Sequence, residues 1–201
     1  MIRTSAELLS SLSDYGNPKN KLNRMVRDQK LYKLKRGLYT EDKRTSPYLI
    51  ANAMFNPSYI SFETALSYYG IIPERTYGYT SATFDKNRTQ TFQNDFGTFY
   101  YRDVPPTVYP LAVRWIQEDG YGYAIATKEK ALCDFLYIQP PSFSIKSFKD
   151  LIFNHLRIDS EEILSLNDAD IAILAPLYNR KNINFLLFLI RRERMECSCH
   201  D

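Results

Sequence analysis

The stretch that most constrains the fold of this chain is residues 4–40, where two short helical patterns precede a basic hairpin pattern. In the first helical pattern, Thr4 or Ser5 can serve as the cap, and three leucines form an apolar stripe. The second begins with Asn17, a good N-cap residue. Pro18 then stands at the first helical position, where its missing N–H costs nothing. The spacing therefore predicts two consecutive helices joined by a tight turn.

The hairpin pattern follows the second helix at once. In residues 32–35 apolar side chains alternate with lysines, Arg36 and Gly37 form a two-residue turn, and residues 38–40 return. The order of helix, turn, basic helix and basic hairpin is that of the winged helix-turn-helix. In such a unit the second helix enters the major groove of DNA and the hairpin lies along the phosphates.

The second predicted helix separates into two faces when it is turned through about 100° per residue. Its apolar side carries Pro18, Leu22, Met25, Val26 and Gln29. The opposite side carries Asn20, Asn23, Arg24 and Arg27, flanked by Lys19, Lys21 and Lys30. Asn and Arg pair with the edges of adenine and guanine, so we expect these two asparagines and two arginines to read bases. The side chains expected at phosphates are Lys19, Lys21, Lys33, Lys35 and Arg36.

Charge is unevenly divided along the chain. Residues 1–44 hold eleven Lys or Arg and five Asp or Glu, a net of +6, whereas residues 45–201 hold fifteen and eighteen, a net of −3; together they give the overall +3. A basic unit joined to an acidic body is typical of a nucleic-acid binder. The other interpretation of the charge alone is a lysine-rich solvated face. We therefore predict a DNA-binding domain over 1–44 and a second domain over 45–201.

Three segments resemble a known family. They are LKRGLYT at 34–40, SPYLIANAMFNPSYISFETALSYYGIIPE at 46–74, and the segment at 126–138 that begins ATKEKALCDFLY. Together they resemble the AbiEi family, the antitoxins and transcriptional regulators of type IV (abortive infection) toxin–antitoxin systems. That family has a basic R-G-Y/L-Y wing and blocks similar to the second and third segments. The resemblance covers most of residues 17–138, and the N-terminal arm of this chain is short beside it.

The resemblance implies a function in phage defence. A member of the family would repress its own operon by binding an inverted repeat upstream of it. It would also counteract a toxin of the nucleotidyltransferase type without forming a stable complex with that toxin. We expect a monomer or weak dimer, with two copies on an operator of this symmetry.

The rest of the chain predicts an α+β body. Strand patterns lie at residues 77–84, 89–93, 98–102, 111–117 and 121–126, and they indicate a small, mostly antiparallel sheet. Helices are expected at residues 48–55, 62–69, 128–138, 147–156, 160–166, 168–178 and 182–195. The predicted fold class is therefore α+β, with an N-terminal winged helix-turn-helix, an α/β body and C-terminal helices.

Polar residues of the body are interpreted structurally. Ser61 and Glu63 fit a helix cap and an acid in the first turn, rather than a catalytic pair. Lys130 and Asp134 are four residues apart on a predicted helix, and we expect an ordinary helix-surface ion pair. No catalytic residue, phosphate-binding glycine loop or paired carboxylate stands out. We therefore expect no enzymatic activity and no cofactor.

Metal binding and membrane insertion are not expected. Cys197, Cys199 and His200 offer three ligands, one short of a closed zinc site. The longest apolar stretch, residues 183–190, is far shorter than the ~20 residues that cross a bilayer. With 44% hydrophobic and 24% charged residues, the composition is that of an ordinary globular protein. We expect a soluble, cytoplasmic protein.

A second function class stays open at this point. Winged helices also bind proteins, and the acidic, tyrosine-rich body could sequester a toxin directly. In that alternative the chain is a protein–protein interaction module with only non-specific affinity for DNA.

Overall fold

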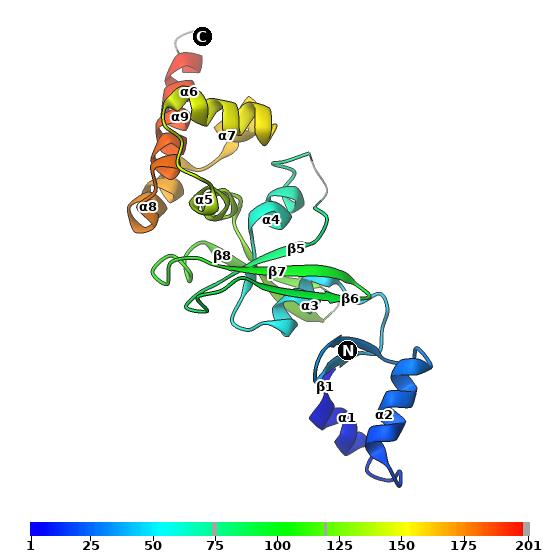
Figure 1. Cartoon of the computed structure of the whole chain (residues 1–201). Helices are drawn as coiled ribbons and strands as arrows, with labels where there is room; N and C mark the ends of the chain where they lie inside the picture. Colours follow the sequence, from blue (N-terminus) through cyan, green and yellow to red (C-terminus); the bar gives the residue numbers. More distant parts are fainter. Residues whose placement is uncertain (74–75, 119, 199–201) are drawn as a thin grey trace.

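The computed structural model describes residues 1–73, 76–118 and 120–198, and over these residues the protein has an α+β fold (Figure 1). The molecule is elongated. A small N-terminal unit lies at one end, a mixed sheet lies in the middle, and the C-terminal helices lie at the other end. None of the described helices has both the length and the apolar character needed to span a bilayer.

The N-terminal unit consists of two helices and a three-stranded antiparallel sheet in the order β1-β3-β2. Its elements are β1 (Ile2–Thr4), α1 (Ser5–Ser11), α2 (Pro18–Arg27), β2 (Tyr32–Lys35) and β3 (Leu38–Thr40). Both predicted helices and the predicted hairpin are confirmed. The strand β1 was not predicted, because three residues without a clear alternation give no strand signal.

Local residue chemistry explains where these elements begin and end. Thr4 caps α1 in a capping box: its hydroxyl accepts from the backbone N–H of Glu7, whose carboxylate accepts from the Thr4 N–H. Asn17 caps α2 through the Asn20 N–H at 3.0 Å. Gly37 turns the hairpin at a φ of +82°, which favours glycine.

The central sheet has six strands in the described part of the chain, in the order β6-β7-β5-β4-β9-β8. The strands are β4 (Tyr59–Ile60), β5 (Tyr79–Thr83), β6 (Gln90–Asn94), β7 (Gly97–Asp103), β8 (Val113–Glu118) and β9 (Tyr121–Ala126). The pairs β4/β5, β6/β7 and β8/β9 are antiparallel, whereas β5/β7 and β4/β9 are parallel.

The expectation of a small, mostly antiparallel sheet is therefore corrected to a larger, mixed one. The two-residue strand β4 gives no sequence signal, yet it lies between β5 and β9 and joins the two hairpins into one sheet. The β6–β7 hairpin also presents β7, not β6, to β5. Alternation predicts strands but does not choose their partners.

Helices cover both faces of this sheet. Figure 1 shows α3 (Pro47–Met54) on one side, with α4 (Phe62–Tyr68) and α5 (Lys128–Ile138) on the other. The C-terminal helices then pack against α5 and one another; they are α6 (Ile145–Asp150), the π-helical turn η1 (Leu151–His155), α7 (Ser160–Ser165), α8 (Asp168–Tyr178) and α9 (Lys181–Ser198). The central helix α5 is consequently buried on both sides.

Two hydrophobic cores lie on opposite sides of the N-terminal sheet. The small one contains Leu8, Leu12, Leu22 and Leu31 and belongs to the N-terminal unit. The large one fills the body, and it also takes in Leu34 and Leu38 from the hairpin. The N-terminal sheet therefore separates the two cores and attaches the unit to the body.

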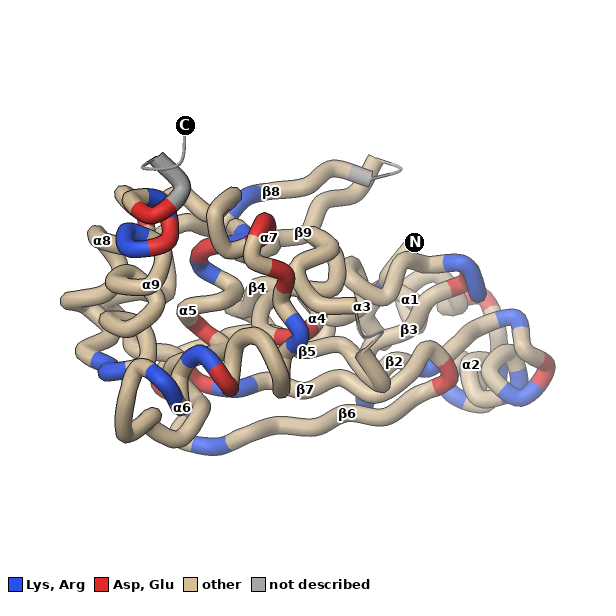
Figure 2. The backbone as a smooth tube through the Cα atoms, turned by 90° about the horizontal axis from the view of Figure 1, so that it is seen from above, with Lys and Arg blue, Asp and Glu red and all other residues tan. Residues whose placement is uncertain are grey.

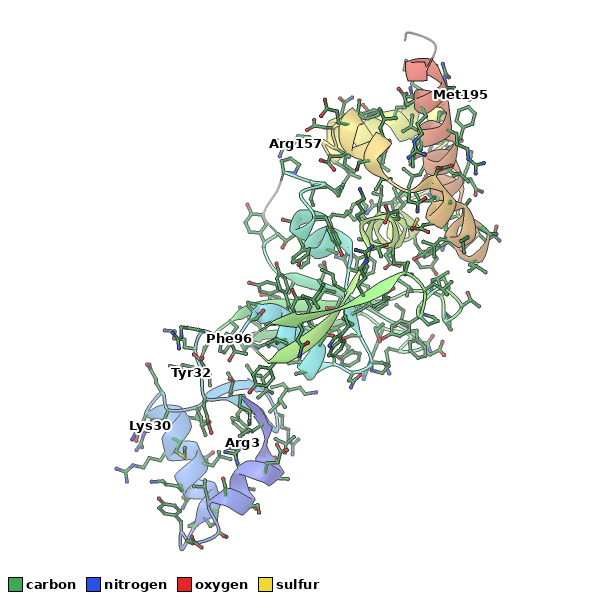
Figure 3. The ribbon with its side chains drawn as sticks, turned by 180° about the vertical axis from the view of Figure 1, so that it is seen from behind. Arg3, Lys30, Tyr32, Phe96, Arg157 and Met195 are labelled. Carbon is green, nitrogen blue, oxygen red and sulfur yellow. The ribbon has the colours of Figure 1, made fainter. Side chains whose placement is uncertain are left out.

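Polar and aromatic contacts reinforce this attachment. The Lys35 ammonium donates to the carbonyl of Met54 at the end of α3. The Asn94 side chain donates to the Leu34 carbonyl at 3.0 Å. The rings of Tyr32 and Phe96 meet edge to face with 6.0 Å between their centres; Figure 3 labels both residues. The hairpin is thus held against the β6–β7 end of the central sheet.

Candidate nucleic-acid interface

The outward face of α2 is the most basic helical surface of the N-terminal unit. Leu22 is buried and Pro18, Met25 and Val26 are half-buried, so these four residues of the predicted inner face are confirmed. Gln29, also placed on that face, is instead exposed beyond the end of the helix. The predicted outer face is exposed; it carries Lys19, Asn20, Asn23, Arg24 and Arg27. No acidic residue lies on the helix itself. Asparagine and arginine side chains are therefore presented together to solvent.

An acidic residue follows directly at the end of this helix. The Asp28 carboxylate lies 3.5 Å from the Arg24 Nε and 3.6 Å from the Arg27 Nε. The two arginine side chains are nevertheless 69% and 76% exposed. Exposed ion pairs contribute little free energy, about 0–1 kcal/mol. Both guanidinium groups are thus free to exchange Asp28 for another anion.

The lysines around α2 differ in their exposure and contacts. Lys19 is exposed, whereas Lys21 is half-buried and its ammonium lies 4.5 Å from the centre of the Tyr15 ring. Lys30, in the loop after α2, is exposed and points away from the body in Figure 3. Figure 2 shows basic positions around α2 and the N-terminal strand, with several acidic positions beside them.

The hairpin residues divide into two groups. Lys33 and Arg36 are exposed, as a phosphate contact requires. Lys35 is half-buried and bound to the Met54 carbonyl, so it faces the body and stands apart from the other predicted site residues. The hairpin tip is anchored to α1, since the Ser5 N–H donates to the Gly37 carbonyl at 2.9 Å. This tie holds the tip of the hairpin at the start of α1.

The prediction that Lys130 and Asp134 pair on the surface of α5 is wrong. Lys130 and Asp134 form an ion pair at 3.1 Å, but both side chains are 0% exposed. Asp134 also accepts from the Ser61 hydroxyl at 2.6 Å, from the Tyr59 hydroxyl at 3.0 Å and from Tyr178. The i, i+4 spacing was interpreted correctly as a pair. The error concerns burial, because α5 lies between the sheet and the C-terminal helices.

Burial changes the pKa values of the groups in this network. Burial lowers the pKa of Lys130, although Asp134 opposes that effect, and burial raises the pKa values of Tyr59 and Tyr178 well above their usual range. Each charged group has hydrogen-bond partners, and the groups are closed off from solvent. This network connects α5 and α8 to the sheet.

Two further expectations concern Ser61 and Glu63. Ser61 occupies the N-cap position of α4, but its hydroxyl makes no capping bond and serves Asp134 instead. Glu63 lies in the first turn of α4, as predicted, and its carboxylate pairs with Arg102 at 3.1 Å. Both residues therefore hold the body together.

The cysteine-rich tail falls largely outside the described residues. This applies to Cys199, His200 and the side chain of Cys197. Cys133 is buried in α5, and burial raises the pKa of its thiol. Where the structure describes the chain, no three His, Cys, Asp or Glu side chains gather as a metal site.

Comparisons with known proteins add no assignment. A scan against models of protein families finds none that matches this chain, and a search of curated proteins finds no match either. What can be said of its function follows from its own residues and their geometry.

Proposed function

We propose that the chain is a sequence-specific DNA-binding repressor whose N-terminal unit is a winged helix-turn-helix. In this proposal α1 and α2 form the helix-turn-helix, α2 enters the major groove, and the β2–β3 hairpin is the wing. The single observation that carries the proposal is the exposed outer face of α2, where Asn20, Asn23, Arg24 and Arg27 stand together above a buried leucine core.

The side chains would divide the work by their chemistry. The two asparagines and two arginines of α2 would bond base edges, because these side chains form paired hydrogen bonds with adenine and guanine. Lys19, Lys21, Lys33 and Arg36 would contact phosphates. Lys35, bound to Met54, would instead hold the wing at a fixed angle to the body.

The regulatory role is proposed from the sequence blocks that resemble the AbiEi family. The protein would repress its own operon from an inverted-repeat operator, one copy on each half-site. It would serve as the antitoxin of a type IV system whose toxin is a nucleotidyltransferase, without a stable complex between the two.

A titration tests the proposal directly. Purified protein is titrated against the duplex upstream of its own gene and against a scrambled duplex, at two salt concentrations. We expect a preference of a hundredfold or more for the upstream fragment. Arg24→Ala should cost about 1–3 kcal/mol on that fragment and relax discrimination. Arg192→Ala, which removes an exposed arginine from α9 at the far end of the molecule, is the matched control and should change nothing.

Two results would overturn the proposal. Equal, weak binding to both duplexes would mean that the N-terminal unit only tethers the protein to DNA. Equal loss on both duplexes for Arg24→Ala would remove the base-reading role of α2. If a co-expressed toxin also co-purifies with the protein, the protein–protein alternative holds.

A further inference from the structure

A cavity of about 930 Å³ opens between the N-terminal unit and the body. Its walls come from the segment that follows β3, from α3 and from the β8–β9 hairpin. The lining residues that matter here are Arg44, Tyr48, Ser58, Tyr109, Trp115 and Tyr121. The volume lies in the range of roughly 300–1,000 Å³ typical of small-molecule sites, which occur preferentially between domains.

Trp115 forms a flat platform in this cavity. A Cβ atom placed on Gly122 would lie 2.2 Å from the indole Cε2, 2.2 Å from Nε1 and 2.4 Å from Cζ2. Three neighbouring ring atoms at nearly equal distances mean that one face of the indole covers Gly122. The side chain is still 68% exposed. One face of the ring is thus fixed by the backbone and the other is open.

Tyrosines on the facing walls are held by their neighbours. The Tyr109 ring lies 5.1 Å from that of Tyr59 and 4.4 Å from that of Phe84. The Tyr48 ring lies 5.3 Å from that of Tyr123. Such packing costs a ligand little ordering entropy when it binds. The cavity therefore offers several preorganised aromatic surfaces.

A cationic group indicates the chemistry of the rest of the ligand. At the rim of the cavity, the Arg44 side chain is 92% exposed and pairs with the Asp42 carboxylate at 3.5 Å. An exposed pair of this kind is weak, so Arg44 can exchange Asp42 for another anion. Ser58 also lines the cavity, but its hydroxyl oxygen is closed off from it. A ligand that combines a planar ring with an anionic group would contact both Trp115 and Arg44.

We propose that this cavity binds a nucleotide. The base stacks on the open face of Trp115, and the Arg44 guanidinium pairs with the phosphate. The same chemistry is present in a free mononucleotide and in an unpaired nucleotide of a single strand. This site is separate from the outer face of α2, and it does not depend on the DNA-binding proposal.

The sequence supplies a direct reporter, because Trp115 is the only tryptophan of the chain. The intact protein is excited at the red edge of tryptophan absorption and titrated with adenosine 5′-monophosphate, adenosine and a short single-stranded oligonucleotide. We expect saturable quenching of the Trp115 emission. Quenching by the mononucleotide assigns a free ligand; quenching by the oligonucleotide alone assigns a nucleotide within a strand.

Two variants test the contacts and a third is their control. Gly122→Ala displaces the indole and should weaken binding at least tenfold. Arg44→Gln should reduce the affinity for the monophosphate to that for adenosine. The control, Ser58→Ala, changes a lining residue whose hydroxyl is closed off from the cavity, so it should leave the nucleotide affinity unchanged.

The proposal is overturned if no probe quenches the emission saturably at millimolar concentration. It is also overturned if the affinity is unchanged in both Gly122→Ala and Arg44→Gln. A thermal melt of each variant shows whether it folds. Should Gly122→Ala fail to fold, Arg44→Gln decides alone. Loss of operator binding with intact nucleotide binding, or the reverse, distinguishes failure of one proposal from failure of the other.

Discussion

Two ion pairs of the same spacing, one at the end of α2 and one within α5, differ in their exposure to solvent. In the N-terminal unit, Arg24 and Asp28 are four residues apart and both are exposed, with 3.5 Å between their charged groups. In the body, Lys130 and Asp134 have the same spacing at 3.1 Å, and neither side chain reaches solvent. The sequence pattern is identical in kind, and the surroundings are opposite.

The difference in exposure decides whether each charged group can exchange its partner. Arg24 can exchange its partner for another anion at little cost, because an exposed pair is screened by water. Lys130 and Asp134 cannot, because removal of one leaves the other charged and buried. The small N-terminal unit displays its cations, and the large body encloses this ion pair as part of its packing.

The largest expected effect is that of breaking the buried pair. Asp134→Ala leaves the Lys130 ammonium and three hydroxyl groups without their acceptor, and it should destabilise the protein by about 3–5 kcal/mol. The free energy of unfolding is measured in urea. The matched control, Asp28→Ala, removes the exposed partner of Arg24 and should change stability by about 0.5 kcal/mol or less. Similar losses for both variants would refute the comparison.

The next largest expected effect is the loss of stability when a leucine of the small core is truncated. Leu22→Ala should cost about 2–3 kcal/mol, because it opens a cavity beside the other three buried leucines, whose half-buried neighbours can partly relax. Amide exchange measured residue by residue should show lost protection in α1 and α2 and retained protection in α5. Ile173→Ala, at a side chain that is 62% exposed, is the control. Uniform loss across the molecule would mean that the two cores unfold together.

A smaller effect is expected from a single phosphate-directed lysine. Lys19→Ala should weaken binding to the operator and to scrambled DNA alike, and it should reduce the slope of log K against log salt by about 1. Titrations at several salt concentrations measure this slope. A loss confined to the operator would place Lys19 among the base-reading residues instead.

The smallest effect concerns the cap of α1. Hydrogen bonds from the Thr4 N–H and hydroxyl lower the pKa of Glu7 below its usual value of ~4.3. The Glu7 carboxylate therefore stabilises the folded state at neutral pH, and this stabilisation is lost as the pH falls through the lowered pKa of the folded state. The carboxylate pKa is measured by NMR titration. Glu7→Gln should flatten the acid dependence of α1 exchange; an unchanged dependence would contradict the capping role.

Much of the local structure could be predicted because its causes lie within a few residues. The caps at Thr4 and Asn17, the turn at Gly37 and the bounds of α5 and α8 all follow from short-range chemistry. The two faces of α2 followed from periodicity alone. The candidate interface was visible in the sequence for this reason, but Lys35, which was predicted to belong to it, faces the body.

Only the tertiary structure decided the rest. The two-residue strand β4, the parallel pairing of β5 with β7 and the contact of Lys35 with Met54 depend on segments far apart in the chain. The burial of Lys130 and Asp134, and the cavity over Trp115, depend on which elements pack against them. Sequence patterns record the periodicity of one segment, and burial is a property of its neighbours. The sequence by itself determined most of the helices, the N-terminal hairpin and the charges that the N-terminal unit carries; packing decided which of those charges reach water.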